Sequence, residues 1–402
     1  MQPATEPNSL KVTLCLGSQT FQKSLAATLM QRGMLARVLS FGPDIEILEP
    51  DGAGNLKLLR KYTHTRTVNR FLWGGWKRLP GSNHSRTLPV VVVAAYADWL
   101  GSKWVPSGDI FHCWAGTCFA SLRAAKKRGA ITMLESPSMH TRDWQKSVLE
   151  ECEACGVRSI DCRSILPEPL MRRMEREYHR GDFIVVPSAV ARESFERAGL
   201  RGKAIVVNAG VDHNFFTPPT MPRPPEIFRV CYSGRVEIAK GVVYLLQAWN
   251  QLGLSNAELV IIGDVAPEMA AFVRRYALPN VRFTGFVPVD QLARWYRESN
   301  LFAFPSSNEG LARVLFEAMA SGLPVIATKS SGAEDCVTPG EDGTIVPIRD
   351  VDALAEAILW HFQNREATAT MGRAARRKIE QQFTVAHYEQ RMIQVYRSVI
   401  QR

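Results

Sequence analysis

The sequence predicts an α/β protein built from two doubly wound, Rossmann-like domains that face each other across a cleft. The chain has 402 residues, of which 46% are hydrophobic, so it can fill two cores. Its apolar segments alternate between the patterns of strands and of helices. This alternation is typical of parallel sheets whose strands are joined by crossover helices.

A proline-rich segment marks the expected boundary between the two domains. Residues 217–226 (TPPTMPRPPE) contain five prolines, which exclude a helix or a central strand. The segment therefore predicts a stiff linker. We expect a first domain over residues 1–215 and a second over 216–385, followed by a final helix over 386–402.

The expected elements follow in chain order. The first strand is at 11–17, after a polar N-terminus without the pattern of a signal peptide. In the second domain we expect strands at 227–233, 258–262, 281–284 and 301–304, with helices at 242–252, 267–276 and 290–298. Ligands of such sheets bind at the carboxyl ends of the strands. The turns with Arg235, Gly263 and Glu309 should therefore meet at one edge, facing the first domain.

Two glutamates, Glu309 and Glu317, lie in a strand, turn, helix and strand pattern over residues 302–328. A helix that begins near Gly310 would separate their carboxylates by roughly 12 Å, enough to hold both ends of an extended ligand. Free N–H groups at the helix start would face an anionic middle. These are the N–H groups of Gly310, Leu311 and Ala312. A nucleotide-sugar fits, with its sugar at Glu309 and its ribose at Glu317. The alternative is a helix cap at Glu309 and a solvated helix face at Glu317.

Two cations follow the strand at 227–233. Arg235 comes directly after the turn glycine Gly234, and Lys240 lies five residues further on. Arg binds phosphate oxygens in a fork and Lys acts as a point charge, so the pair suits a diphosphate and could neutralise a leaving nucleoside diphosphate without a metal. The alternative is a surface loop with solvated cations.

No metal or other cofactor is expected. The cluster Cys152, Cys155 and Cys162 lacks a second close pair that would complete four zinc ligands. Free thiols in a reducing compartment are the simpler interpretation. The expected location is therefore the cytoplasm.

These segments resemble the family-4 glycosyltransferases, retaining enzymes of the GT-B fold. The resemblance is strongest after Ala204 and is supported by matches at 185–195, 206–216, 259–265 and 281–288. It implies that a hexosyl group moves from a nucleoside-diphosphate sugar, as co-substrate, to a glycan or lipid-linked acceptor in polysaccharide or glycolipid synthesis. It also implies that the first domain binds the acceptor, the second binds the donor, and the last helix crosses back.

The resemblance assigns roles to individual residues. Arg235 and Lys240 would bind the donor pyrophosphate, Glu309 the sugar and Glu317 the ribose, with Val287 near the base. The usual mechanism in such enzymes is a front-face route, in which the departing phosphate oxygen takes the proton of the acceptor hydroxyl. The protein then positions the substrates and stabilises charge.

In the first domain the sequence departs from the commonest family pattern. The turn after the first strand has one glycine, Gly17, instead of the usual two, and one glycine still permits a tight turn in which Gly17 contacts the donor phosphate. Many members have a histidine at the end of the strand in 131–140, where this chain has Glu135 or Ser136. His140 lies a few residues after Glu135 and Ser136. We favour it over His112 as a catalytic residue. A loop hydrogen bond is the alternative for His140.

The whole chain has a net charge of +10, and much of this excess lies in residues 52–97, which contain basic residues and no Asp or Glu. Trp73 and Trp76 lie among these cations. Basic residues beside aromatics suit an anionic membrane surface, here the inner face of the membrane. Binding of an anionic acceptor and a solvated face are the alternatives. Nucleic acid is not expected, because no recognised module accompanies the charge.

Two other functions use the same features. A nucleotide-sugar 2-epimerase would share the fold and the donor site but would convert the donor without an acceptor. A non-catalytic, membrane-docked scaffold with a vestigial donor site would bind nucleotide without turnover. The presence of Arg235, Lys240, Glu309 and Glu317 together disfavours the scaffold.

Overall fold

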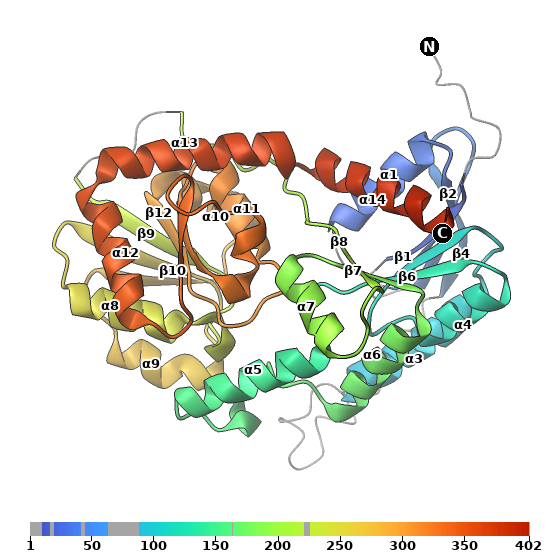
Figure 1. Ribbon diagram of the computed structural model, residues 1–402, viewed down its shortest axis with the longest axis horizontal. Coiled ribbons are helices and arrows are strands. Elements are labelled where there is room, and N and C mark those ends of the chain that lie inside the picture. The colour runs from blue at the N-terminus through green and yellow to red at the C-terminus, as the bar shows by residue number, and fades with distance from the viewer. Residues whose placement is uncertain are drawn as a thin grey trace.

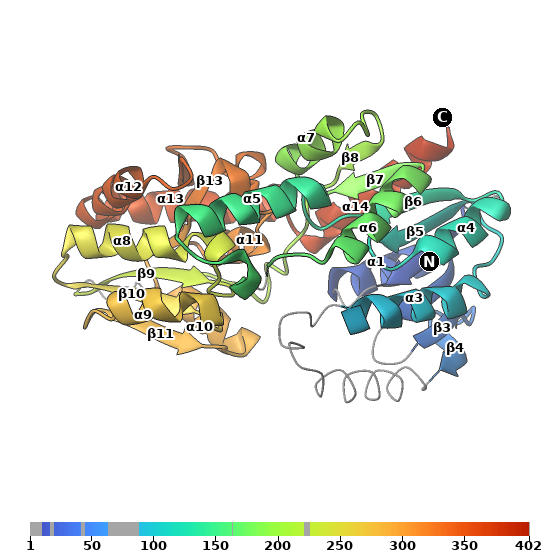
Figure 2. The ribbon, with the colours of Figure 1, turned by 90° about the horizontal axis from the view of Figure 1, so that it is seen from below.

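A computed structural model describes residues 10–16, 20–41, 45–62, 88–162, 164–220 and 226–401. It has two lobes side by side, each built around one sheet with helices packed against it (Figure 1). The view from below shows the two sheets at either end of the long axis (Figure 2). This arrangement confirms the predicted pair of doubly wound domains.

The first lobe contains an eight-stranded sheet in the order β4-β3-β2-β1-β5-β6-β7-β8. Its strands are β1 Val12–Leu16, β2 Leu35–Phe41, β3 Ile45–Pro50, β4 Leu56–Tyr62, β5 Ile110–Trp114, β6 Ile131–Glu135, β7 Phe183–Val186 and β8 Ala204–Val206. Its helices are α1 Thr20–Gln31, α3 Leu88–Ser102, α4 Phe119–Lys127, α6 Glu168–Arg180 and α7 Ala189–Arg197. Strands β2, β3 and β4 pair antiparallel at one edge, and the other pairs are parallel.

The second lobe contains a six-stranded, fully parallel sheet in the order β11-β10-β9-β12-β13-β14. Its strands are β9 Phe228–Ser233, β10 Ala257–Ile262, β11 Val281–Gly285, β12 Leu301–Phe304, β13 Val325–Thr328 and β14 Gly343–Val346. Its helices are α8 Val242–Leu252, α9 Ala270–Arg275, α10 Val289–Glu298, α11 Arg313–Ala320, α12 Val351–Gln363 and α13 Arg365–Gln382. Short 3-10 turns are η2 Ser159–Asp161, η3 Ile238–Lys240, η4 Pro267–Met269, η5 Lys329–Ser331 and η6 Ala333–Asp335. The elements predicted for this lobe are confirmed.

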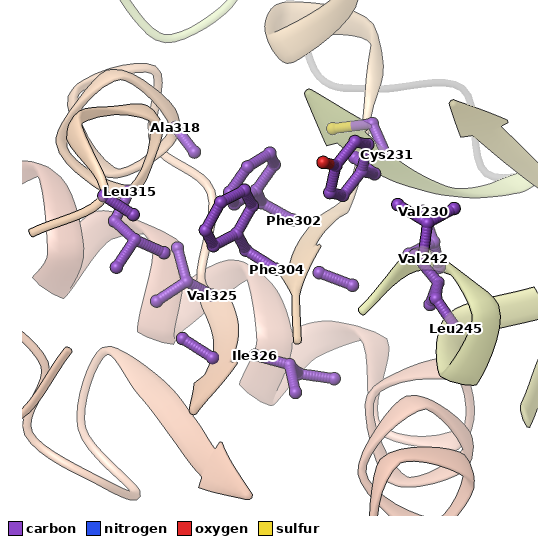
Figure 3. Packing of buried hydrophobic residues seen from close by; sticks show 14 of the residues in the cluster. Val230, Cys231, Val242, Leu245, Phe302, Phe304, Leu315, Ala318, Val325 and Ile326 are labelled. Carbon is purple, nitrogen blue, oxygen red and sulfur yellow. The ribbon is translucent and has the colours of Figure 1, made fainter. Parts of the chain in front are cut away.

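The core of the second lobe explains why its strands read as continuous apolar runs. Val230 of β9, Phe302 of β12 and Val325 of β13 are completely buried, and helices α8 and α11 cover them with Leu245 and Leu315 (Figure 3). A parallel strand that is covered on both faces needs apolar side chains at successive positions.

Two helices each lie against the lobe that their place in the chain does not suggest. Helix α14 (Val385–Ile400) continues from α13 along the upper side of Figure 1 and packs on α1 of the first lobe. Its buried Tyr388, Met392 and Tyr396 join the cluster that contains Val12 and Leu14 of β1.

Helix α5 (Thr141–Ala154) follows β6 of the first lobe but lies under both lobes in Figure 1. Its Val148 and Cys152 belong to the hydrophobic core of the second lobe, as does Cys162 beyond it. The assignment of all of residues 1–215 to the first domain therefore needs correction. The apolar face of α5 packs on the second lobe, and the direction of a helix after a strand is not encoded in chain order.

Several sequence predictions fall outside the described residues. These are the Gly17 contact, the part of the basic stretch from 63 to 87 with Trp73 and Trp76, and linker residues 221–225. Residues 88–97, at the end of that stretch, are apolar and belong to α3. Among the helices that the structure describes, none is long and apolar enough to cross a membrane.

Candidate functional site

The turns after β9, β10 and β11 contact one another at the carboxyl edge of the second sheet. The Gly234 N–H donates to the Ile262 carbonyl at 3.0 Å, and the Gly263 N–H donates to the Gly285 carbonyl at 3.0 Å. Gly263 has a φ of +139°, and a Cβ there would lie 2.0 Å from the Gly234 oxygen. Only glycine fits at this position. The turns at Gly234 and Gly263 therefore pack directly against each other at this edge.

A charged cluster of four residues lies at this edge: Arg235, Glu237, Lys240 and Glu309. Lys240 forms an ion pair with Glu309 and lies 3.9 Å from Glu237, while Arg235 lies 3.5 Å from Glu237. The Arg235 side chain is 60% exposed, whereas those of Lys240 and Glu309 are 14% and 15% exposed. The structure thus brings together three predicted site residues and one that the sequence reasoning missed, Glu237.

The predicted helix start needs correction. Helix α11 begins at Arg313, not near Gly310, and the Ala312 N–H is not free because it donates to the Ser331 carbonyl at 3.0 Å. The expected separation of the Glu309 and Glu317 carboxylates assumed a helix over the whole segment between them. Only the part from Arg313 to Glu317 is helical. The N–H groups of Gly310 and Leu311 have no hydrogen-bond partner within the described residues.

Gly310 is held in place by contacts with the first lobe. Its carbonyl accepts a hydrogen bond from the Ser188 hydroxyl, and a Cβ at Gly310 would lie 2.5 Å from the Pro137 oxygen. Asp335 adds a second link between the lobes by accepting from the Ala189 N–H at 3.1 Å. These contacts explain why the helix begins three residues late.

Glu317 is half-buried near the end of β9. It accepts a hydrogen bond from the Tyr296 hydroxyl at 3.3 Å, and Tyr296 in turn contacts the Ser233 hydroxyl at 2.5 Å. Burial raises the pKa of Glu317 to about 7, although the nearby Arg313 charge and the Tyr296 hydrogen bond lower it. This carboxyl therefore titrates near neutral pH.

Beyond β11, Val287 is half-buried, whereas its neighbour Phe286 is 74% exposed. An aromatic ring so exposed at the carboxyl edge of a sheet offers a stacking surface for a flat ligand group. Phe286 is the direct neighbour of Val287, the residue expected near the base. Its signal is an aromatic residue directly after the strand-end glycine Gly285.

His140 caps a helix in the structure. It is the N-cap of α5, and its Nδ1 accepts from the Arg142 N–H at 3.3 Å. The ring packs 5.3 Å from the Phe195 ring and 5.4 Å from the Tyr178 ring, and burial lowers its pKa. These contacts match the loop hydrogen bond that was the alternative to a catalytic role.

His112 lies on β5 inside the first lobe. Its Nδ1 contacts the Tyr396 hydroxyl of α14 at 2.6 Å, and its Nε2 lies 3.4 Å from Glu135. Burial lowers the pKa of His112 to about 4, so the ring is neutral at pH 7.

A cavity of about 90 Å³ lies between the lobes. The ends of β5, β6 and β7 form its first-lobe side, and Leu311 and Arg313 contribute from the second lobe. Glu135, which is buried, provides a carboxylate to this cavity and accepts from the Tyr388 hydroxyl at 3.3 Å. Because both lobes and α14 form the cavity, local sequence patterns do not predict it.

Within the part of the chain that the structure describes, no group of three or more His, Cys, Asp or Glu side chains is arranged to hold a metal ion. Cys152, Cys155 and Cys162 are free thiols near α5.

Comparison with known proteins agrees with this geometry. Residues 227–364 match the family model described as "Glycosyl transferases group 1". The sulfoquinovosyl transferase SQD2 of Arabidopsis thaliana is 27% identical over 54% of this chain and 45% of its own length. The capsular polysaccharide biosynthesis glycosyltransferase CapM of Staphylococcus aureus is 32% identical over 39% of this chain and 42% of its own length. The chain thus spans about half the length of the curated relatives it matches.

Among solved structures, HepE of Anabaena in complex with UDP is similar over nearly the whole chain. The TM-score is 0.64 at 17% sequence identity, with 97% of this chain and 100% of that chain covered. A likeness at this identity shows the fold. The chain therefore has the GT-B fold, and its residues 227–364 match the model of the group 1 glycosyl transferases.

Proposed function

We propose that the protein is a retaining glycosyltransferase that moves a hexosyl group from a nucleoside-diphosphate sugar to a glycan or lipid-linked acceptor. The observation that supports this most directly is the charged cluster beside Glu317 at the carboxyl edge of the second sheet, the edge where doubly wound domains bind ligands. The names of the relatives, a sulfoquinovosyl transferase and a capsular polysaccharide biosynthesis glycosyltransferase, support the substrate class.

The donor would lie along this edge. Arg235 and Lys240, with the unpaired N–H groups of Gly310 and Leu311, would hold the diphosphate. The two cations now pair with carboxylates, and the diphosphate would replace these carboxylates as their partner. Glu309 would bind the sugar and Glu317 the ribose. Phe286 and Val287 would contact the base, and HepE, a structure of the same fold, holds UDP.

The acceptor would enter the cavity between the lobes. Its side opposite the donor edge carries the buried Glu135 carboxylate, which can accept a hydrogen bond from a hydroxyl. Transfer with retention would follow the front-face route, in which the leaving phosphate oxygen takes the acceptor proton. Two cations neutralise the leaving group in this scheme, so the reaction needs no metal.

A donor panel tests the proposal. Binding and slow hydrolysis of UDP-, GDP- and ADP-sugars would be followed by mass spectrometry, with wild type beside Glu309→Ala. We expect one nucleotide class to bind and to be consumed, and consumption to fall in the variant. The transferase proposal fails if no donor binds or if Arg235→Ala binds donor as well as wild type. Conversion of the donor to an epimer without acceptor would indicate the 2-epimerase instead.

The pKa of Glu317 predicts a pH dependence of donor binding. Below pH 7 the carboxyl is protonated and is a weaker acceptor for ribose hydroxyls, so affinity for a UDP-sugar should rise several-fold between pH 6 and pH 8. Calorimetric titration with a UDP-sugar measures this, because its phosphate diesters do not titrate in that range. The Glu317→Gln variant should bind without this pH dependence, and an unchanged profile in that variant would contradict the assignment.

The same pKa shift affects stability with the opposite sign. The folded state holds a proton on Glu317 between pH 4.5 and about 7, whereas an unfolded chain has lost it. The contribution of this group to the free energy of unfolding therefore falls as the pH rises through that window.

We also propose that the first lobe docks onto the anionic inner face of a membrane, which places the enzyme in the cytoplasm. Strand β4 exposes Leu58 and Leu59, at 48% and 42%, beside the exposed cation Lys57. On α3, Trp99 is 51% exposed, with Lys103 3.7 Å from its ring centroid. Exposed apolar and aromatic side chains beside cations suit an interfacial contact.

Sedimentation with liposomes tests this docking. We expect binding to anionic vesicles that is released by salt, and an affinity reduced about fivefold in Lys57→Gln, since each cation near the surface contributes about 1 kcal/mol. Lys127→Gln, an exposed lysine on α4, is the matched control. Equal sedimentation with neutral vesicles would contradict the proposal.

A further inference from the structure

Helix α5, which follows β6 of the first lobe, contacts the donor edge of the second lobe. The side-chain amide of Asn308, directly before Glu309, donates to the Trp144 carbonyl at 3.0 Å, and the Ser147 hydroxyl donates to the Ser307 carbonyl at 3.4 Å. Two residues of the loop that carries Glu309 are thus tied to one helix that follows the first-lobe strand β6.

The far end of α5 is anchored equally firmly. Glu151 is completely buried, and its carboxylate accepts from Nε of Arg349 at 2.9 Å and from the Tyr244 hydroxyl of α8. Val148, which lies between Ser147 and Glu151 along α5, packs in the second-lobe core. Helix α5 is therefore fixed on the second lobe from Trp144 to Glu151, and its side chains have defined positions there.

One of these side chains, Trp144, lies beside the central cation of the charged cluster. The Lys240 Nζ lies 5.6 Å from the centroid of the Trp144 ring, within the range of a cation–π contact. The ring itself is oriented, because its indole N–H donates to the Ser164 carbonyl at 3.1 Å. The aromatic face is thus a fixed part of the surroundings of Lys240.

We infer that Trp144 of α5, the helix that follows β6 of the first lobe and packs on the second, is a positioning residue for Lys240 in diphosphate binding. This inference rests on the proposed function. The other neighbours of Nζ are the carboxylates of Glu309 and Glu237, and an incoming diphosphate competes with both for the cation. An aromatic face attracts the ammonium without carrying a net charge. It holds Nζ in place while the cation changes its partner from carboxylate to phosphate.

The test measures UDP and GDP affinity by calorimetry, using whichever diphosphate wild type binds more tightly. Trp144→Leu keeps an apolar side chain but loses the aromatic face, and we expect its Kd to rise about fivefold. Trp144→Phe keeps an aromatic face and should bind within about twofold of wild type. Thermal melting of each variant reports whether α5 stays docked.

A double-mutant comparison separates positioning from structure. In the Lys240→Met background, Trp144→Leu should cause no further loss of affinity, because the residue through which Trp144 acts is gone. A fivefold loss of affinity that persists in that background would overturn the inference. Equal affinities of Trp144→Leu and wild type would also overturn it. So would a Trp144→Phe variant that loses as much affinity as Trp144→Leu and melts at a lower Tm. Wild type that binds neither diphosphate would instead overturn the proposed function itself, and the inference with it.

Discussion

Replacement of Lys240 by methionine is expected to lower the rate of donor turnover by about 100- to 1,000-fold, the usual cost of removing one group that stabilises developing charge. Lys240 pairs with Glu309 and lies 3.9 Å from Glu237, in a position where 14% of its side chain is exposed. Its loss leaves two carboxylates near the site of the diphosphate. These would repel the leaving group that the lysine would otherwise neutralise.

The measurement is consumption of the donor at saturating and at limiting concentration, with or without acceptor. Lys240→Arg should restore part of the rate, since it returns the charge in a different shape. Lys127→Met, at an exposed lysine on α4, is the control for the loss of one surface charge. Turnover within threefold of wild type in Lys240→Met would remove this lysine from the mechanism.

Replacement of Gly310 by alanine is expected to reduce turnover about 100-fold and to weaken UDP binding much less, because the Gly310 N–H is only one of the groups proposed to hold the diphosphate. The new Cβ would lie 2.5 Å from both the Pro137 oxygen and the Ser138 Cα, which are backbone atoms of the first lobe. Backbone atoms cannot move aside as a flexible side chain can, so the lobes must separate. A misplacement of about 1 Å between reacting groups can cost 100-fold in rate.

Calorimetry with UDP and donor consumption together test this prediction. The charged cluster lies on the second lobe, so its own geometry should persist in the variant. Gly108→Ala is a matched control, because its Cβ would lie 3.3 Å from the Lys11 oxygen in the first lobe, away from the cavity. Turnover equal to wild type in Gly310→Ala would show that this contact does not govern the reaction.

The sequence predicts the second lobe well because its signals are local. The central strands there are covered on both faces, as Val230 of β9 and Phe302 of β12 are, and so appear as apolar runs. Arg235, Lys240 and Glu309 follow the ends of such strands, and parallel strands bring those ends to one edge. The contact between Lys240 and Glu309 is thus a consequence of topology that can be read along the chain.

What the sequence reasoning missed depends on contacts between distant segments. The start of α11 is delayed to Arg313 because Gly310 bonds with Ser188, 122 residues away. The interdomain placement of Trp144 depends on the direction that α5 takes after β6. For His140 the structure shows a helix cap, which the sequence left open beside a catalytic role.

The return of α14 to the first lobe has a consequence for synthesis on the ribosome. Tyr388, Met392 and Tyr396 complete an apolar cluster whose earliest members, Val12 and Leu14, emerge more than 370 residues before them. Chains fold from the N-terminus as they are made. The lobe that is translated first is therefore the last to close its core, and until then it presents an apolar face that chaperones would need to shield.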